Sequence, residues 1–297
     1  MGAANMNMNM NMNMNMGGAG LGLPSVAPAQ VRFNTADYRK KVPNPPGLLA
    51  VSPPPSFPVN WDPDLRSYIC LNDFVLGNTG WFAALKAVAD GVGQPNAPAA
   101  PPVPSPLESQ LQAVLDASPD REDRFAEIIH QHDAEGAISY FLGMLMIDPA
   151  RHPNTYLLIR VARRVGELVT MVLKGAYKVP RPSQFCPAIV PMIDPPVTPS
   201  FPAGHALEAT LIALALKDAW AQPPGPGLQP RRVLLDYLAQ RLGENRIIAG
   251  LHFPLDIIAG EAVAQTCYPM LKNPPPGVLP VNLLFNQVLA AARLESV

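Results

Sequence analysis

Proline sets the strongest limit on how this chain can fold. Its 37 prolines are more than about twice the average share for a chain of 297 residues. They gather at residues 43–58, 95–106, 180–202, 223–230 and 274–280. Proline fixes φ and cannot donate a backbone hydrogen bond, so these clusters predict loops and extended connectors. Regular structure must come from the segments between them.

Those segments carry apolar residues at helical spacing, and none alternates as a strand would. Helices are expected at residues 73–89, 105–117, 121–147, 154–177, 203–220, 230–243, 254–270 and 281–294. Ser105 is expected to cap the second of these, with Pro106 at its first helical position, and Gly136 could break the third. The predicted fold class is all-α, a helical bundle with long Pro-rich loops.

Three regions are expected along the chain. Residues 1–20 hold an Asn-Met repeat followed by glycines, a low-complexity pattern that predicts a disordered tail. Residues 21–65 are expected to form an irregular N-terminal arm. Residues 66–297 are expected to fold as a single helical domain, because 48% of the chain is hydrophobic and can bury a sizeable core.

Charge and hydropathy narrow the classes of partner. The formal net charge of −1 at pH 7 gives no support for nucleic acid. We see no signal peptide, and the best apolar run, residues 137–147, is shorter than the roughly 18 to 20 residues that span a bilayer. A soluble, cytoplasmic protein without a transmembrane segment is therefore expected. The last helix could pack on the body of the domain or on a second copy in a homo-oligomer.

Three segments place cations or histidines where a helix meets a loop. In the first, Lys174 lies near the end of a buried helix, where a lysine is costly to bury without an anion. Arg181 follows between Pro180 and Pro182, which fix the backbone and hold the guanidinium fork in one direction, as bidentate phosphate binding requires. Taken alone, this segment is also typical of a basic helix C-terminus.

The second segment, residues 199–205, opens a predicted helix. Gly204 lets the backbone come close to a ligand, and the first free N–H groups of a helix favour an anion. His205 is placed to pass a proton to a leaving group. An ordinary helix start with a surface histidine would have the same pattern.

The third segment joins an arginine to a histidine and an aspartate. Pro254 is expected in the first turn of a helix, which puts His252 at or just before its cap. Asp256, four residues on, can reach back to one ring nitrogen and leave the other as a nucleophile or ligand. Arg246 adds a second guanidinium. A capping aspartate beside a solvated histidine is the alternative.

Together the segments hold the groups that phosphoryl transfer needs. Three cations would neutralise a dianionic phosphate or vanadate, one histidine would attack or coordinate, and a second would handle protons. A run of arginines, Arg160, Arg163 and Arg164, could frame another anion site, but an ion-paired or solvated face is the favoured interpretation.

The three segments resemble the signature motifs of the type 2 phosphatidic acid phosphatase and vanadium haloperoxidase superfamily. The matching residues are Lys174, Arg181, Pro182, Pro202, Gly204, His205, Arg246, His252 and Asp256. The motifs span residues 174–256, and the likeness is expected to extend over about 135–270. Two positions depart from the pattern, because Ala203 and Asn245 stand where the family usually has serine. The first change removes a hydroxyl donor, which can be worth about 2.7–4 kcal/mol in other transition states.

The resemblance implies a role for each matching residue. Lys174, Arg181 and Arg246 would hold the equatorial oxygens of the oxyanion, helped by the Gly204 N–H. His252 would form a phosphohistidine in a phosphatase or bind vanadate in a haloperoxidase, so it would be a metal ligand only in the second case. The remaining implied roles are His205 as the acid and base, and Asp256 as the residue that orients the nucleophile.

Three functions remain open on the sequence. The first is an acid-phosphatase-like hydrolase of small phosphate monoesters without a cofactor, favoured by the 46 residues between His205 and His252, which leave little room for long insertions. The second is a vanadium-dependent haloperoxidase that holds vanadate and oxidises halide with peroxide in the same pocket. The third is a non-catalytic oxyanion-binding protein, suggested by Ala203.

Overall fold

The computed structural model describes residues 61–93, 106–220, 228–272 and 283–295. The chain divides into the units Met1–Val59 and Asn60–Val297, and all described residues lie in the second. The predicted tail and nearly all of the predicted arm lie outside the described residues. A helix begins at Pro63, so the irregular arm was predicted to extend too far. The other domain boundaries stay predictions.

The described residues form helices joined by irregular segments. The helices are α2 (Pro63–Gly77), α3 (Trp81–Gly93), α4 (Leu107–Asp116), α5 (Arg121–His130), α6 (Ala134–Leu145), α7 (Pro153–Tyr177), α8 (Pro182–Phe185), α9 (Gly204–Ala219), α10 (Leu228–Ile248), α11 (Pro254–Lys272) and α12 (Leu283–Ala292), with a 3-10 turn at Ser118–Asp120. No strand occurs within the described ranges, and the predicted all-α fold is confirmed.

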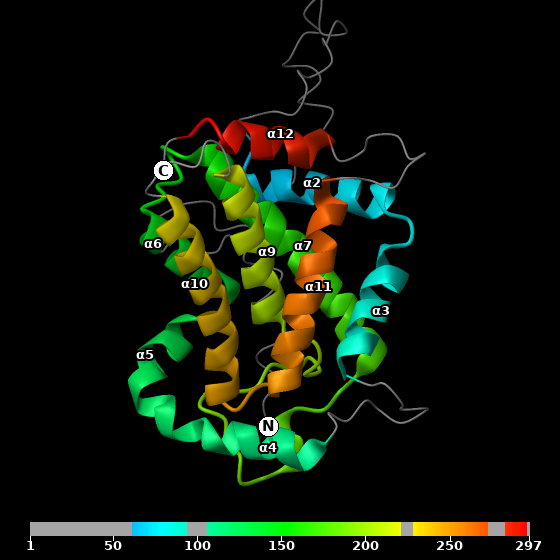
Figure 1. The fold of residues 1–297 in the computed structure, drawn as a ribbon, viewed down its shortest axis with the longest axis vertical. Helices are drawn as coiled ribbons and strands as arrows, with labels where there is room; N and C mark the ends of the chain where they lie inside the picture. Colours follow the sequence, from blue (N-terminus) through cyan, green and yellow to red (C-terminus); the bar gives the residue numbers. More distant parts are fainter. Residues whose placement is uncertain (1–60, 94–105, 221–227, 273–282, 296–297) are drawn as a thin grey trace, which may run out of the picture. The chain divides into compact units, whose positions relative to one another are not determined.

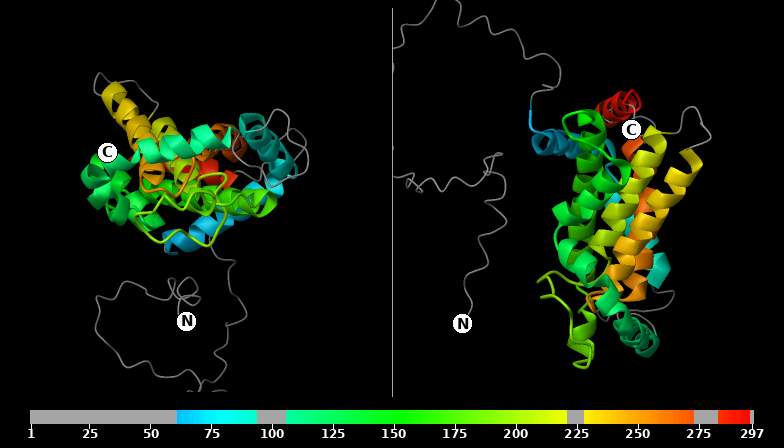
Figure 2. Two further views of the ribbon diagram at one scale, coloured as in Figure 1. Left: turned by 90° about the horizontal axis from the view of Figure 1, so that it is seen from below. Right: turned by 90° about the vertical axis from the view of Figure 1, so that its left-hand side faces the viewer.

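Helix α9 lies at the centre of the bundle, and α7, α10 and α11 surround it (Figures 1 and 2). Its sequence is apolar around most of the circumference, which is the pattern of a helix that is buried on all sides. Helices α2 and α12 cross one end of the bundle, while α4 and α5 lie at the other end (Figure 1).

Two glycines allow the neighbouring helices to approach α9 closely. A Cβ atom on Gly166 of α7 would lie 2.9 Å from the Cγ atom of Glu208, and one on Gly260 of α11 would lie 2.7 Å from the carbonyl oxygen of Ala203. A larger residue at either position would push the helices apart. The glycines therefore hold α7 and α11 against the first turns of α9.

The helix predicted at residues 73–89 is wrong in its bounds, because two helices meet there. Helix α2 ends at Gly77 and α3 begins at Trp81. Between them, the Asn78 side chain donates hydrogen bonds to the Phe74 carbonyl at 2.9 Å and the Met270 carbonyl at 3.2 Å. A polar side chain that bonds backbone groups competes with helix continuation.

The helix predicted at residues 121–147 is also two helices, and the break does not fall at Gly136. Helix α5 ends at His130, and α6 starts after Asp133, whose carboxylate accepts the Gly136 N–H at 2.7 Å. A Cβ atom on Gly136 would lie 1.7 Å from the His130 carbonyl oxygen. The junction therefore leaves no room for a side chain at position 136. The glycine lies in the first turn of α6 and does not end a helix.

The other helices lie close to their predicted positions. Pro106 is the N-cap of α4 and not its first helical residue, and Ser105 lies outside the described residues. The predicted connector at 180–202 contains the short helix α8. Helix α10 continues five residues past its predicted end, so Arg246 lies on a helix.

Helix α12 packs on α7 and α9 of its own chain. Within the described ranges, we find no helix that is both long enough and apolar enough to cross a membrane. The predicted cytoplasmic location and the homo-oligomer stay predictions.

Candidate active site

The three sequence segments converge at one end of the bundle, where α7 and α10 end and α9 and α11 begin (Figure 1). Their principal side chains are nearly inaccessible to solvent. The exposed fractions are 4% for Lys174, 4% for Arg181, 1% for Arg246, 4% for His252 and 0% for Asp256. Three cations and one carboxylate are thus buried together, which leaves an excess of positive charge.

His252 and Asp256 form the geometry that their spacing predicted. The ring Nδ1 atom lies 3.1 Å from the Asp256 Oδ2 atom, and the ring Nε2 atom lies 3.3 Å from Nη1 of Arg181. A guanidinium can only donate, so Nε2 carries the lone pair and Nδ1 carries the proton. Burial, with the cations Lys174 and Arg181, holds the pKa of His252 well below its usual range.

Ser200 and the Phe253 backbone hold Asp256 in place. The Ser200 hydroxyl donates to Asp256 Oδ2 at 2.5 Å, and the Phe253 N–H donates to the same oxygen at 3.0 Å. Burial raises the pKa of Asp256. Ser200 lies within the second sequence segment, but its role could not be predicted, because nothing in its spacing connects it to an aspartate 56 residues away.

The turn before His252 explains how the histidine reaches the site. At the end of α10, the Gly250 N–H bonds the Ile247 carbonyl at 2.8 Å and the Leu251 N–H bonds the Arg246 carbonyl at 3.0 Å. Gly250 has φ +77°, so the segment ends the helix in a Schellman motif. The chain turns back at once, and His252 comes to lie beside the helix end that carries Arg246.

Arg181 is held by the loop that follows it. Its Nε atom donates to the Thr198 carbonyl at 3.0 Å, and its Nη1 atom donates to the Leu251 carbonyl at 2.9 Å. Its own N–H donates to Gln184 Oε1 at 2.7 Å. Burial lowers the pKa of Arg181 to about 10, which leaves the side chain charged at neutral pH. The Thr198 and Leu251 carbonyls hold the guanidinium in one direction, and its binding of phosphate stays a prediction.

Lys174 lies in the last turn of α7 and donates to the carbonyl groups of Pro199 and Ser200. Burial and the neighbouring Arg181 lower its pKa. Its partners are neutral carbonyl groups rather than a carboxylate. When protonated, the lysine adds to the positive potential of the site, and a bound anion would favour that protonated form.

Gln131 connects the remaining arginine and histidine. Its backbone carbonyl lies 3.3 Å from Arg246 Nη1 and 2.9 Å from His205 Nε2. Burial and the nearby arginine lower the pKa of His205 to about 3. Gln131 stands at the C-cap of α5, so the break between α5 and α6 directs its carbonyl into the site. The sequence analysis missed this residue, because a backbone acceptor leaves no signal in residue type.

Ala203 is the N-cap of α9, and no side-chain hydrogen bond caps the helix there. Its own N–H donates to the Asp256 carbonyl at 3.0 Å, and its methyl group is fully buried against Ala206 and Ile257. Gly204, the first helical residue, lies at the uncapped end. The first N–H groups of α9 thus face the site without a side-chain acceptor from the cap.

Asn245, the other departure from the family pattern, joins two helices through its side chain. Its side chain donates to Gln131 Oε1 at 2.9 Å and to Glu127 Oε2 at 3.0 Å, and it accepts from Arg124 at 3.1 Å. These contacts tie α10 to α5 and hold the residue that contacts both Arg246 and His205.

A cleft of about 480 Å³ opens beside Arg181. Two chain segments line it, residues 178–184 and 195–199, with Lys178, Ser183 and Thr198 among its polar groups. The cleft is of a size that suits a small ligand.

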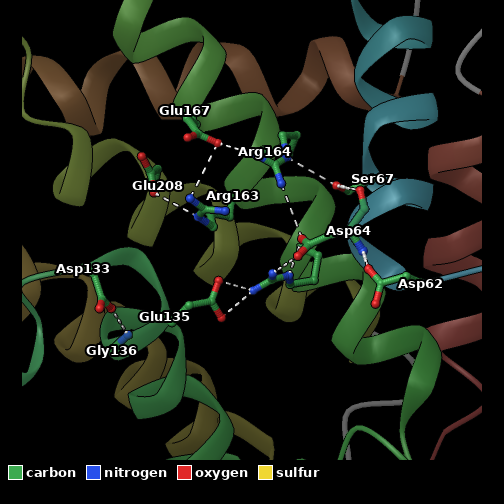
Figure 3. Close-up of polar contacts among 11 residues, drawn as sticks. Asp62, Asp64, Ser67, Asp133, Glu135, Gly136, Arg163, Arg164, Glu167 and Glu208 are labelled. Carbon is green, nitrogen blue, oxygen red and sulfur yellow. Dashed lines mark hydrogen bonds and ion pairs between the residues drawn. The ribbon is translucent and has the colours of Figure 1, made fainter. Parts of the chain in front are cut away.

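The arginine run on α7 is ion-paired, as the favoured interpretation expected. Arg160 bonds the carboxylates of Asp64 and Glu135. Arg164 pairs with Glu167 at 2.8 Å, as Figure 3 shows. Arg163 pairs with Glu167 at 3.6 Å and, more loosely, with Glu208 at 3.8 Å. These three arginines are matched by carboxylates and form no second anion site.

Two curated relatives are similar to this chain, namely the decaprenylphosphoryl-5-phosphoribose phosphatases of two Mycobacterium tuberculosis strains, CDC 1551 / Oshkosh and H37Rv. Each is 28% identical over 137 residues, which is 46% of this chain and 71% of the relative. No protein-family model matches the chain.

Among solved structures, the chain is similar to the first transmembrane PAP2 type phosphatidylglycerolphosphate phosphatase from Bacillus subtilis. The sequence identity is 17% and the TM-score is 0.43, over 67% of this chain and 94% of that one.

Proposed function

We propose that this chain, a member of the type 2 phosphatidic acid phosphatase superfamily, hydrolyses phosphate monoesters through a phosphohistidine on His252. The observation that carries the proposal is the orientation of that imidazole. Asp256 holds Nδ1 at 3.1 Å, and Nε2 faces the Arg181 guanidinium at 3.3 Å. A lone pair is thereby directed at the place where a guanidinium would hold a phosphate.

Two further donors support an oxyanion as the ligand. Arg246 Nε and the Thr170 hydroxyl are buried and have no hydrogen-bond partner among the described residues. A buried donor without an acceptor costs about 1–3 kcal/mol, which an anion in the site would recover. The same residues would also fit vanadate.

In the first step, His252 Nε2 forms a bond to phosphorus as the bond from phosphorus to the ester oxygen breaks. Lys174, Arg181 and Arg246, with the Gly204 N–H, stabilise the charge on the equatorial oxygens. The leaving oxygen takes a proton from His205.

That proton comes with the substrate. His205 is neutral in the structure described, and an oxyanion beside it would raise its pKa again, so it can accept the proton of a phosphate monoanion. In the second step, His205 takes a proton from water, the hydroxyl oxygen bonds to phosphorus, and the bond from phosphorus to His252 breaks.

The leaving group would occupy the cleft beside Arg181. Its volume of about 480 Å³ is large enough for a small alcohol or sugar. This supports the small phosphate monoester that the sequence predicted as substrate.

The test is hydrolysis of p-nitrophenyl phosphate by His252→Ala, with His132→Ala as the control because that histidine is exposed and outside the site. The first variant is expected to lose at least about 10³-fold in kcat, and the second to keep it. Quenching in alkaline detergent during turnover of a substrate with a labelled phosphate group should trap an acid-labile, alkali-stable phosphohistidine only where His252 is present. Wild-type turnover in His252→Ala would refute the assignment.

The rival functions are outcomes of the same assay. Bromination with peroxide after loading with vanadate, without ester hydrolysis, would favour a haloperoxidase. Binding of vanadate with neither activity would favour a non-catalytic oxyanion-binding protein.

A further inference from the structure

Thr170 lies on α7 one turn before Lys174, on the face that packs against α9. A Cβ atom on Gly204 would lie 3.2 Å from Thr170 Cγ2 and 3.8 Å from Thr170 Oγ1. The threonine side chain is therefore against the uncapped first turn of α9. Its spacing of four residues from Lys174 puts both side chains on one stripe of the helix.

The Thr170 hydroxyl is unusual for a threonine inside a helix. Such hydroxyls commonly bond the carbonyl four residues earlier. Here the side chain is 3% exposed, and the hydroxyl has no partner among the described residues. A hydroxyl so deeply buried is costly without an acceptor.

The surroundings define what the acceptor would be. Lys174 lies one turn away, and the N-cap Ala203 offers no side-chain acceptor to the helix. The first turn of α9 lies against this position, and the carboxyl that the described residues bring near it is Glu208, whose Oε1 atom would lie 3.6 Å from a Cβ atom on Gly204. A ligand there must accept hydrogen bonds, as a tetrahedral oxyanion does.

We propose that Thr170 donates its hydroxyl to an oxygen of the bound oxyanion and so supplies the donor that Ala203 lacks. The inference rests on the proposed function, because it names a further residue of the same site. The donor comes from the α7 side of the site, whereas a serine at position 203 would supply it from the N-cap of α9.

The experiment compares Thr170→Val, Thr170→Ser and the double variant Thr170→Val/Ala203→Ser, with p-nitrophenyl phosphate as substrate and orthovanadate as inhibitor. Valine keeps the shape and removes the hydroxyl. We expect it to lower kcat/KM about 10- to 100-fold, mostly in kcat, and to weaken vanadate inhibition by a similar factor. Serine at position 170 should keep activity within about threefold.

The double variant is the decisive arm, because it returns a hydroxyl from a different helix. It should recover at least about tenfold over Thr170→Val. The matched control is Thr210→Val, a threonine of α9 that is 8% exposed and lines a different cavity. This control should leave kcat, KM and vanadate inhibition unchanged.

A Thr170→Val enzyme within twofold of wild type would overturn the inference. So would a loss that Thr170→Ser does not restore, since that loss would come from packing. If Thr170→Val does not fold, Thr170→Ala and the double variant Thr170→Ala/Ala203→Ser replace it. Higher activity in the double variant than in Thr170→Ala supports the inference, and no gain overturns it. His252→Ala separates the failures, because an active His252→Ala overturns the proposed function and an inactive one leaves only Thr170 in question.

Discussion

Two clusters of three basic side chains, one carried by α7 and one that includes Lys174 near its C-terminal end, differ in what surrounds them. Arg160, Arg163 and Arg164 pair with carboxylates from four helices (Figure 3). The cations of the candidate site instead donate mainly to backbone carbonyl groups, and the carboxylates of Asp256 and Glu208 act on the charge of Lys174 from nearby.

The difference decides what each cluster can do. Carboxylates neutralise the arginine run, and the result is a clamp that joins α2, α6 and α9 to α7. Carbonyl groups satisfy hydrogen bonds without cancelling charge, so the site keeps a positive potential that favours an anion. A cluster of basic residues in a sequence therefore forms an anion site only if its hydrogen-bond acceptors in the folded protein are neutral.

The same substitution of lysine for arginine in each cluster tests this difference. Arg181→Lys keeps the charge but loses the fork that meets Leu251, Thr198 and His252. We expect kcat/KM to fall about 10²- to 10³-fold, and the free energy of unfolding to fall by about 1–3 kcal/mol because the Leu251 and Thr198 carbonyls lose a donor. Arg160→Lys should lose a similar amount of stability but keep kcat/KM within about twofold.

Steady-state kinetics and thermal unfolding of both variants check this prediction. A large activity loss in Arg160→Lys, or a stability loss alone in Arg181→Lys, would show that the two clusters do not divide the work in this way.

The second prediction concerns the one carboxylate in the site. Asp256→Asn should lower kcat about 10- to 100-fold, because an amide that donates to Nδ1 would favour the tautomer with the proton on Nε2. The Ser200 hydroxyl and the Phe253 N–H lose their ionised acceptor at the same time. Trapping of the phosphohistidine measures the first step directly, and an unchanged trapping rate would contradict the role given to Asp256.

The smallest effect on activity is expected at Glu208, which faces Arg163 and Arg164 of one cluster and Lys174 of the other. Burial raises its pKa to about 7. Since this folded-state pKa lies above the unfolded value of about 4.3, the folded form binds the proton more tightly, and stability falls as pH rises from about 4.3 to 7. Glu208→Gln removes this decline.

The Glu208→Gln protein should therefore match wild type near pH 4.5 and be more stable by up to about 3–4 kcal/mol above pH 7, because a difference of one in pKa corresponds to about 1.36 kcal/mol. The charged groups that face Glu208 are Arg163, Arg164, Glu167 and Lys174 of α7. Chemical unfolding at several pH values checks this, with Glu122→Gln as the control for an exposed carboxylate. A difference that does not change with pH would contradict the prediction.

The sequence predicted the residues of the site better than the structure around them. Lys174, Arg181, Arg246, His252 and Asp256 come together because their spacing follows the ends of helices that proline marks. Their roles remain proposals.

The parts that could not be predicted depend on tertiary contacts. Thr170 has the spacing of any core residue of α7, and Gln131 acts through its backbone. The helix breaks near residues 78 and 131 were missed because each is fixed by packing against another helix rather than by a proline. An i, i+4 relation to Lys174 was the one signal that pointed to Thr170.

The Schellman turn at the end of α10 has a consequence for how this protein can diverge. It fixes the spacing of six residues from Arg246 to His252, because the Leu251 N–H donates a hydrogen bond to the Arg246 carbonyl. One inserted or deleted residue would rotate the imidazole away from the guanidinium by roughly 100° of helix. The loops around the cleft can therefore vary in sequence, whereas the number of residues between Arg246 and His252 cannot change.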